Sequence, residues 1–579
     1  MKTVLKYYRP YIPFVALILL LLFGQAMCEL ALPGYMSDII NNGIVKQDMS
    51  CIRETGLIML AVSAAAVACS VTGSFLAART AAGSSRDIRK SLFRKVTAFS
   101  AAELERFSTA SLITRSTNDI QMVQQATVMI LRLACFAPMM GIGAVIKALN
   151  TSVSLSWTVG LALLVILCIM AMAFFLVLPK FQVLQKKLDD LNLFIKERLS
   201  GLLVIRAFTT EKTEEQRFDR ANLSLTKINM FVNRAMSFMM PALMFVMNAV
   251  CILIIWAGAH LIDTQQLLIG DMLAYLQYAM HVIMSFLYIT MMFIMIPRAA
   301  VSAQRIGSVL DVEPVIEDPQ EPVKNDRARG LIQFRNVSFA YPDAEEKTLE
   351  KISFTAEPGK TTAVIGGTGS GKSTLISLIP RFYDVTEGEI LLDGVDVRDM
   401  SQHDLREQIG YVPQKGLLFS GTIASNLQYG RKDATREELL EAAETAQAME
   451  FIGEKEHGFD EEVSQGGTNV SGGQKQRLSI ARALIKKPAV YIFDDSFSAL
   501  DFKTDKALRD ALSEKVGGST MIIVAQRINT IIDADQIIVL DEGRIAGIGN
   551  HEQLMESCSV YKEIALSQLS EEELERGRK

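Results

Sequence analysis

The chain has 579 residues, half of them hydrophobic, and its mean hydropathy of +0.24 excludes an ordinary soluble protein. The length allows several domains, and a formal net charge of −5 argues against nucleic acid as a main partner. Its 7 cysteines show no paired spacing, so neither a disulfide framework nor a cysteine-based metal site is expected.

Six apolar stretches fill the first half of the chain. Each comes near the roughly 20 residues that a transmembrane helix needs. A signal peptide is the alternative for the first stretch, but that stretch is long, lacks a clear cleavage site and is followed by further spans. The predicted spans are Tyr11–Pro33 and about Thr55–Ala78, Val128–Lys147, Trp157–Leu178, Met236–Ile262 and Met272–Ile296.

The loops between these spans differ sharply in charge. Loops 79–125 and 180–234 are long and rich in Lys and Arg, whereas 147–156 and 263–271 are short and nearly free of them. The positive-inside rule therefore places both termini and both long loops in the cytoplasm. Apolar residues recur at three- and four-residue spacing in the long loops, so the membrane helices are predicted to continue beyond the bilayer.

A few side chains within the spans suggest a substrate path. Glu29 and Arg132 are ionisable groups in apolar runs, where such groups tend to face a cavity or a partner. Glu29 is expected toward the outer side and Arg132 toward the inner side, so they are not expected to pair. His281 either faces the cavity or packs as a neutral side chain. Methionine and phenylalanine crowd the last two spans and either line an adaptable cavity or face lipid.

The second half of the chain changes character. Residues 311–330 are rich in Pro and charge and are interpreted as a linker. From 331 to 570, short β-branched strands alternate with helical stretches, as in a P-loop α/β domain. The charged tail 571–579 is expected to fray. The predicted fold class is therefore multidomain, with an α-helical six-span membrane domain over 1–310 and a P-loop α/β domain after the linker.

The stretch GGTGSGKST, Gly366 to Thr374, fits the P-loop pattern G-x-x-x-x-G-K-[ST]. A buried strand is predicted just before it, at Thr361–Ile365, and a helix is predicted to begin at Leu375, which is the context that the motif requires. The predicted nucleotide contacts in this loop are Gly366, Gly367, Thr368, Gly369, Ser370, Gly371, Lys372, Ser373 and Thr374.

The residue types of this loop suit phosphate. Positive φ at Gly366, Gly369 and Gly371 is expected to turn backbone N–H groups toward phosphate oxygens. Lys372 is expected to reach the β- and γ-phosphates, and the Ser373 hydroxyl to bind Mg²⁺.

Two further motifs follow the P-loop. Val490–Asp494 is a hydrophobic strand that ends in a carboxylate, which is typical of a Walker B element, and Asp494 is predicted to help hold Mg²⁺. A Ser-Gly-Gly turn that opens a helix is interpreted as a second phosphate grip, and a simple N-cap at Ser471 is the alternative. Its predicted contacts are Ser471, Gly472, Gly473 and Gln474.

P-loop, SGGQ and Walker B in this order resemble an ATP-binding cassette (ABC) protein. Six spans fused ahead of them resemble an ABC exporter half-transporter over essentially the whole chain. The resemblance implies that Tyr341 stacks on adenine, that Gln414 touches Mg²⁺ and the attacking water, and that 498–501 form the D-loop. Residues 107–119 and 201–211 resemble the two coupling loops that dock on the cassettes. The implied metal ligands are Ser373, Gln414 and Asp494.

Two positions depart from the family pattern. Asp495 stands where the family usually has a catalytic Glu, and its carboxylate would sit about 1.5 Å farther from the water, a displacement that can cost about 10²-fold in rate. Gln526 stands where the family has a switch His, and it cannot carry a proton. The candidate catalytic residues are Asp495, Gln526, Gln414 and Asp494, and weak hydrolysis is expected.

The two departures predict one subunit of a heterodimer. ABC cassettes pair head to tail, so the signature 471–474 would complete a competent site on the partner. The resemblance is to the degenerate-site subunit of heterodimeric bacterial multidrug exporters in the cytoplasmic membrane. It implies ATP and Mg²⁺ as cofactors and a small amphipathic substrate. The alternatives are a dedicated lipid or peptide exporter, an importer of the same fold, and an ATP-gated channel or regulatory ATP-binding subunit.

Overall fold

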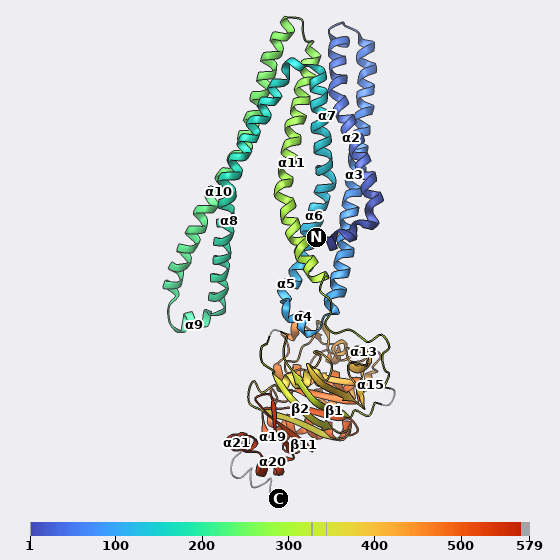
Figure 1. The fold of residues 1–579 in the computed structure, drawn as a ribbon, viewed down its shortest axis with the longest axis vertical. Coiled ribbons are helices and arrows are strands. Elements are labelled where there is room, and N and C mark those ends of the chain that lie inside the picture. The colour runs from blue at the N-terminus through green and yellow to red at the C-terminus, as the bar shows by residue number, and fades with distance from the viewer. Residues whose placement is uncertain (1, 326–327, 343, 569–579) are drawn as a thin grey trace. The chain divides into compact units, whose positions relative to one another are not determined.

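The computed structural model describes residues 2–325, 328–342 and 344–568, and it divides into two compact units (Figure 1). Unit 1 comprises residues 1–96 and 110–312, and unit 2 comprises 97–109 and 313–579. The segment 97–109 therefore belongs to the compact unit of the second half, although the sequence places it in the membrane domain. The predicted frayed tail, 571–579, lies outside the described residues.

Unit 1 is helical, and the described chain has six helical segments long and apolar enough to cross a membrane, which confirms the predicted six-span domain. The helices predicted in the charged loops are also present, because α3 and α10 run for 49 and 53 residues. The six segments are Thr3–Ile44, Met49–Thr97, Thr109–Thr151, Val153–Val177, Glu211–Asp263 and Ile269–Leu310.

The helices of the first half, with α4 in unit 2, are α1 (Lys2–Leu5), η1 (Lys6–Tyr11), α2 (Ile12–Asp38), η2 (Ile39–Ile44), α3 (Met49–Thr97), α4 (Ala101–Arg106), α5 (Thr109–Thr114), η3 (Arg115–Asp119), α6 (Ile120–Met129), η4 (Ile130–Ala134), α7 (Cys135–Thr151), η5 (Val153–Leu155), α8 (Ser156–Ser200), α9 (Leu202–Ala207), α10 (Glu211–Asp263) and α11 (Ile269–Leu310).

The long helices of unit 1 pack in two groups. α11 lies along α7, α2 and α6, whereas α8 lies along α10, and Figure 1 shows α8 and α10 as a hairpin with α9 at its turn. The approach of α7 to α11 needs a small residue, since a Cβ at Gly141 would lie 2.5 Å from Oγ of Ser285. Two turns before Ser285, the Tyr278 hydroxyl of α11 donates to the carbonyl of Leu30 on α2 at 3.3 Å.

Polar contacts hold both ends of α11. In its first turn, Asp271 accepts a hydrogen bond from Oγ of Ser37 at 2.6 Å. Near its other end, the buried Asp119 accepts from Oγ of Ser302 at 3.0 Å and pairs with Arg305 at 3.3 Å. A buried carboxylate requires such partners, so these contacts fix where α11 meets η3.

Unit 2 is an α/β domain, as predicted. Its largest sheet has the order β12-β11-β3-β10-β9-β6, in which every pairing is parallel except that of β11 with the edge strand β12. A second, antiparallel sheet has the order β2-β1-β4-β5, and β7 pairs with β8. In the large sheet Val524 of β10 lies between Val364 of β3 and Asp494 of β9, so these three strands end side by side.

The strands of unit 2 are β1 (Ile332–Phe339), β2 (Leu349–Ala356), β3 (Thr361–Gly366), β4 (Glu387–Leu392), β5 (Val395–Asp396), β6 (Ile409–Val412), β7 (Gly421–Thr422), β8 (Glu462–Val463), β9 (Val490–Asp494), β10 (Thr520–Val524), β11 (Gln536–Asp541) and β12 (Arg544–Gly549). Its remaining helices are α12 (Lys372–Leu378), α13 (Gln402–Glu407), α14 (Ile423–Leu427), α15 (Arg436–Thr445), α16 (Met449–Gly453), η6 (Gly458–Asp460), η7 (Gln465–Gly467), α17 (Gly472–Lys486), α18 (Phe502–Val516), α19 (Ile528–Ile531), α20 (His551–Ser557) and α21 (Ser559–Gln568).

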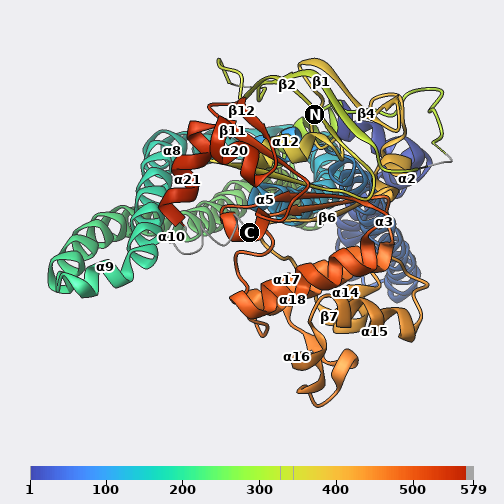
Figure 2. The same cartoon turned by 90° about the horizontal axis from the view of Figure 1, so that it is seen from below.

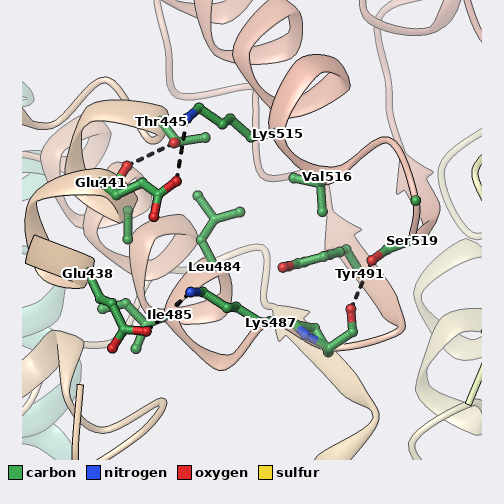
Figure 3. A pocket seen from close by; sticks show the side chains of 13 residues that line it. Glu438, Glu441, Thr445, Leu484, Ile485, Lys487, Tyr491, Lys515, Val516 and Ser519 are labelled. Atoms are coloured by element: carbon green, nitrogen blue, oxygen red, sulfur yellow. Dashed lines mark hydrogen bonds and ion pairs between the residues drawn. The ribbon is translucent and has the colours of Figure 1, made fainter. Parts of the chain in front are cut away.

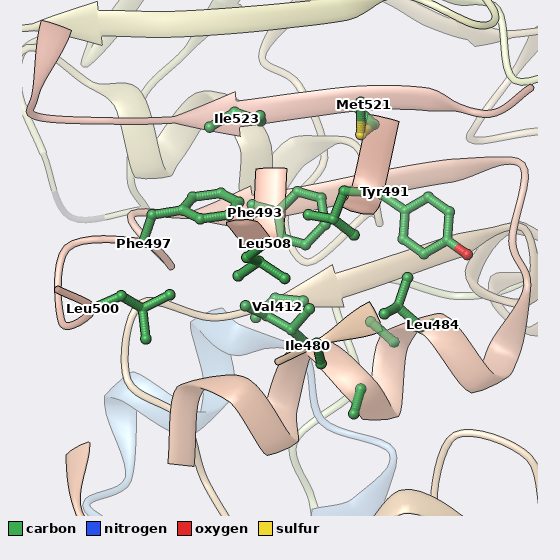
Figure 4. Close-up of a cluster of buried hydrophobic side chains, with 14 of the residues drawn as sticks. Val412, Ile480, Leu484, Tyr491, Phe493, Phe497, Leu500, Leu508, Met521 and Ile523 are labelled. Atoms are coloured by element: carbon green, nitrogen blue, oxygen red, sulfur yellow. The ribbon is translucent and has the colours of Figure 1, made fainter. Parts of the chain in front are cut away.

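The two faces of the large sheet bury separate apolar cores. Every residue of β9 is buried, and because side chains alternate along a strand, Tyr491 and Phe493 enter one core while Ile492 enters the other. Figure 4 shows the first core, where Phe493 lies close to Ile480 of α17 and Leu508 of α18. Helices α14 to α18 gather on one side of the unit (Figure 2). This packing fixes where α17 begins.

One carboxylate holds the chain where it enters β1. Oδ2 of Asp393 accepts from the backbone N–H groups of Arg329 at 2.8 Å and Gly330 at 3.2 Å. Its Oδ1 accepts from the N–H of Leu331 at 2.9 Å. Hydrogen bonds to a charged acceptor contribute about 1.5–3 kcal/mol each where they are sheltered, and less where water competes.

Asp393→Ala is expected to lower the free energy of unfolding of unit 2 by about 2–3 kcal/mol, because three backbone donors lose one charged acceptor. The φ of 52° at this position also suits Asp better than Ala. Calorimetric unfolding of the full chain measures the effect. Asp399→Ala is the matched control, since that exposed carboxylate lies in the same segment. Equal midpoints for the two variants would contradict the role of Asp393.

Candidate functional site

The carboxyl ends of neighbouring parallel strands bring three sequence motifs to one edge of the large sheet. β3 leads into the loop 366–374, β9 ends at Asp494 and is followed by Asp495, and Gln526 lies two residues after β10. Parallel strands that pair in register end at the same edge, which is where open α/β sheets bind ligands. The structure thus groups residues that are far apart in the sequence.

The loop 366–374 needs glycine at three positions, for two different reasons. Gly369 and Gly371 have φ of 85° and 95°, as predicted. The expected positive φ at Gly366 is wrong: there a Cβ would collide with the carbonyl oxygen of Leu540 and lie 2.7 Å from Oγ of Ser370. The following helix begins at Lys372, three residues before its predicted start, because Gly371 is its left-handed N-cap.

The lysine and serine of the loop are already oriented. Nζ of Lys372 donates to the carbonyl oxygens of Gly366 at 2.8 Å and Gly367 at 2.7 Å. Burial lowers the pKa of Lys372, although the neighbouring carboxylates Asp495 and Asp494 oppose that shift. Oγ of Ser373 donates to Oδ1 of Asp494 at 3.1 Å. The ammonium therefore lies across the loop, and the hydroxyl lies against the end of β9.

Asp494 has the environment of a cation ligand. It is 6% exposed, and burial raises the pKa of its carboxyl, to which the charge of Asp495 adds. A divalent cation would favour the ionised form, and Mg²⁺ takes hard oxygen ligands such as carboxylate and hydroxyl oxygens. The Asp494 and Ser373 oxygens therefore fit the predicted metal. The amide nitrogen of Gln414 donates to Asp495, so its amide oxygen is available as a further ligand for the predicted metal.

The carboxylate of Asp495 is held by two glutamines. Its Oδ2 accepts from Nε2 of Gln414 at 3.1 Å and from Nε2 of Gln526 at 2.9 Å. Asp495 is 8% exposed and has a φ of 47°, a left-handed conformation that Asp tolerates better than most residues. The two positions that depart from the family pattern are therefore in direct contact, which their separate positions in the sequence did not indicate.

Aromatic side chains connect the loop 366–374 to α4. The Tyr341 hydroxyl lies 3.0 Å from Oγ1 of Thr374, and the ring meets that of Tyr383 edge-on, with centroids 5.3 Å apart. The Tyr383 hydroxyl donates to Oε1 of Glu105 on α4 at 2.8 Å. Burial, together with Glu105, raises the pKa of Tyr383. Sequence analysis missed Tyr383 and Glu105, because the coupling loop predicted at 107–119 begins after α4.

A second residue of α4 meets the linker. Glu103 is buried, and its Oε1 accepts from the N–H of Val315 at 2.6 Å. Burial alone would raise the pKa of Glu103, but hydrogen bonds from Ser100 and Val315 lower it overall. Ser100 and Glu103 also form a capping box at the start of α4. That S-x-x-E spacing is a signal in the sequence that marks this helix.

The signature turn lies at the start of α17. Ser471 is the N-cap, and its Oγ accepts from the N–H of Gln474 at 3.3 Å, while Gln474 returns a bond to the N–H of Ser471. Ser471 and Gly472 are exposed, and a Cβ at Gly472 would meet open space. Within the described part of the chain, no hydrogen bond joins this turn to the loop 366–374. Ser471 thus acts as an N-cap within the chain, as the alternative interpretation states. The outer face of the turn 471–474 remains open to a ligand.

The last described helix braces Gln526. Nε2 of Gln568 donates to the carbonyl of Gln526 at 2.9 Å, and Oε1 of Gln568 accepts from the N–H of Ile528 at 2.9 Å. One amide side chain therefore satisfies two backbone groups of the segment that positions Gln526. Sequence analysis missed Gln568, because 42 residues separate it from Gln526 and it belongs to no motif.

A pocket of about 340 Å³ lies apart from these motifs, between α15, α17 and α18 (Figure 3). Its two lysines are paired, Lys487 with Glu438 at 3.1 Å and Lys515 with Glu441 at 3.4 Å. Its charges therefore balance, and none of the predicted nucleotide contacts lines it.

Two protein families match this chain. Residues 15–286 match the ABC transporter transmembrane region, and residues 349–498 match the ABC transporter family. The chain is 40% identical, over 571 residues and 97% of each chain, to an uncharacterized ABC transporter ATP-binding protein of Mycobacterium tuberculosis (strain CDC 1551 / Oshkosh). The chain belongs to the ABC transporter family. Its first half is the transmembrane region, and its second half is an ABC-type ATPase cassette coupled to transport.

Other relatives of this ABC half-transporter extend the comparison. It is 38% identical to an uncharacterized ABC transporter ATP-binding protein of Bacillus subtilis over 99% of each chain. It is 34% identical to an ATP-dependent lipid A-core flippase of Haemophilus influenzae over 83% of this chain and 82% of the relative. Its fold resembles that of a bacterial Atm1-family ABC exporter with ATP bound, with a TM-score of 0.77 at 24% identity over 97% and 99% of the two chains.

The comparisons confirm the predicted family, the half-transporter fold and the multi-pass membrane character. The individual roles of the site residues stay predictions. So do Mg²⁺, the orientation of the termini, the heterodimer and the multidrug substrate.

Gln568→Ala is expected to speed amide hydrogen exchange in the segment 526–531 about fivefold, because loss of a hydrogen bond costs about 1 kcal/mol and frees the N–H of Ile528. Exchange measured by mass spectrometry on the full chain tests this. Gln553→Ala removes a comparable cap in α20 and should affect only that helix. Unchanged exchange at 526–531 in the first variant would show that Gln568 does not brace the segment.

Proposed function

We propose that this chain is one subunit of a heterodimeric ABC exporter, and that its own site binds ATP but hydrolyses it poorly. The pairing of Asp495 with both Gln414 and Gln526 carries this proposal. The complex moves amphipathic compounds, drugs foremost, outward across the cytoplasmic membrane. Both termini and the cassette lie in the cytoplasm, as the Lys and Arg content of the loops 79–125 and 180–234 supports.

Slow hydrolysis follows from the surroundings of Asp495. Its side chain is one methylene shorter than Glu, and moving its carboxylate toward a water would break hydrogen bonds to Gln414 and Gln526. Each such bond to a charged acceptor is worth about 1.5–3 kcal/mol. Gln526 donates its N–H to Asp495 and has no proton to transfer. This site therefore keeps ATP bound for longer than a competent site needs to hydrolyse ATP.

Nucleotide binding uses residues that match the family pattern. Loop 366–374 receives the phosphates through backbone N–H groups, and Lys372 exchanges loop carbonyls for phosphate oxygens. Tyr341 stacks on the adenine. Ser373, Asp494 and Gln414 hold Mg²⁺, which when bound neutralises phosphate charge. This half of the site is complete, in contrast to the half that acts on water.

Two exposed features support a partner subunit. The signature 471–474 has an open outer face and makes no hydrogen bond to this chain's own nucleotide loop in the described residues. At the turn between α8 and α10, Leu203 of α9 is 82% exposed, and Phe208, directly after α9, is 73% exposed. An apolar helix tip in an aqueous compartment is unfavourable unless it is covered, and docking on a cassette of the complex would cover it.

Lipid export is the second candidate. Its support is the relative of Haemophilus influenzae, which is named as an ATP-dependent lipid A-core flippase. The two candidates share architecture and differ only in the molecule moved, so transport of a labelled lipid and of a drug by the same reconstituted complex separates them. ATP-dependent conductance without pumping would instead indicate the channel alternative.

The lone chain is expected to hydrolyse ATP at least about 10²-fold more slowly than the complex with its partner, because both sites of a homodimer would carry the misplaced carboxylate. The double variant Asp495→Glu, Gln526→His should raise hydrolysis by the lone chain about tenfold or more. Steady-state ATPase assays in lipid nanodiscs measure both. Hydrolysis by the unmodified lone chain at the rate of the complex would refute the weak-site proposal.

Ser471→Arg is expected to lower turnover of the complex at least about 10²-fold, although it leaves loop 366–374 intact, because a long cation fills the phosphate grip that serves the partner's site. Thr435→Arg is the matched control, since it removes the N-cap of α15 in the same unit. Loss of activity in both variants would point to a folding defect, and retained activity in the first would contradict the head-to-tail assignment.

A further inference from the structure

Helix α2 carries a carboxylate inside an apolar run. Glu29 is half-buried, and its Oε1 accepts from Nε2 of Gln25, one helical turn earlier, at 2.8 Å. A carboxylate can accept about four hydrogen bonds. Across residues 2–325, 328–342 and 344–568, no ion pair involves Glu29. Most of the acceptor capacity of this carboxylate is therefore unused within the described residues.

The polar side of α2 faces away from its lipid side. Phe23 and Met27 are 53% and 42% exposed and form an apolar stripe suited to lipid. Residues two positions apart lie about 200° apart around a helix, so Gln25 and Glu29 are on the opposite side from that stripe. Leu30, the residue after Glu29, is buried in the core that α2 shares with α7 and α11.

Helix α11 presents a polar face next to Glu29. The His281 ring is close enough to interact electrostatically with the Glu29 carboxylate. The neighbouring Tyr278 binds the carbonyl of Leu30, which fixes α11 against α2 at this level. Gln277 and Met284, one turn to either side of His281, are exposed. The open face of α11 therefore adjoins Glu29.

This open face lies between two helix contacts. On one side of it α11 packs on α2 through Tyr278, and on the other side Met280 lies 3.8 Å from Cys251 of α10. An exposed strip flanked by helices of the same unit on both sides is a wall of the space between them. Its polar and soft side chains suit a ligand with one charged group and an apolar body.

The nearest cations on the adjacent span do not neutralise Glu29. Leu30, the next residue, abuts Gly143 of α7. Arg132 comes eleven residues before Gly143, so it lies about 16 Å away along the helix. Lys147 comes four residues after Gly143, about 6 Å farther out, and its exposed side chain can extend toward the outer surface.

We propose that Glu29 is the anionic anchor of a binding site for organic cations, positioned by Gln25 and flanked by His281. An uncompensated carboxylate in a membrane span is costly, and a bound cation removes that cost. The same charge disfavours anionic amphipaths. This inference rests on the exporter function proposed above and names the substrate class of that transporter.

The test uses the full chain in lipid nanodiscs and two probes of similar size, the cation tetraphenylphosphonium and the neutral triphenylphosphine oxide. Glu29→Gln is expected to weaken tetraphenylphosphonium binding at least tenfold and to change binding of the neutral probe less than twofold. Glu54→Gln removes an exposed carboxylate of α3 as the matched control and should change neither. Unchanged ATP affinity of the cassette shows that each variant is folded.

Three outcomes would overturn the proposed site. Glu29→Gln could bind tetraphenylphosphonium as tightly as the unmodified chain does, or it could lose affinity for both probes equally. The third outcome is that the unmodified chain does not bind tetraphenylphosphonium at all. Glu29→Asp, which keeps the charge, should retain affinity within about threefold. Vesicle transport by the complex separates this inference from the function on which it rests. ATP-driven export that survives Glu29→Gln with unchanged probe preference overturns only the site. Glu29-dependent binding without any ATP-driven export overturns only the exporter.

Discussion

The nucleotide site depends on the parallel pairing of β3, β10 and β9. That register places the ends of three strands at one edge, so that the loop 366–374, the buried Asp494 and the segment of Gln526 meet although they come from distant parts of the chain. Because side chains alternate along β9, the same strand also contributes Phe493 to the core beneath α17. The position of α17 and that of the Asp494 carboxylate therefore share one structural origin.

Much of this architecture could be predicted because strong local patterns specify it. Six long apolar runs identify the membrane helices, and the P-loop pattern identifies a strand, a loop and a helix together. The errors came where tertiary contacts decide. Gly366 is required by the nearby Leu540 carbonyl and not by its own φ, and α4 packs with the second half of the chain although it follows a membrane span.

The candidate site was predictable residue by residue but not as a network. Motifs identify Asp495, Gln526 and Gln414 singly, whereas their shared hydrogen bonds require the folded sheet. Gln568 and Tyr383 have no motif at all, since a single amide or phenol acquires its role only from what it contacts. Periodicity and spacing carry information about elements, while such bridging contacts depend on how elements far apart in the chain come together.

The three-residue cluster around Asp495 also limits how this site can change during evolution. A longer carboxylate at that position would extend into the space where the amides of Gln414 and Gln526 now converge on one oxygen. A histidine at 526 in place of Gln would replace one of the two amide donors by a ring N–H with a different reach, while the short carboxylate remained. Either substitution alone, Glu at 495 or His at 526, thus disturbs hydrogen bonds that the other two residues supply. The three residues therefore constrain one another's replacement.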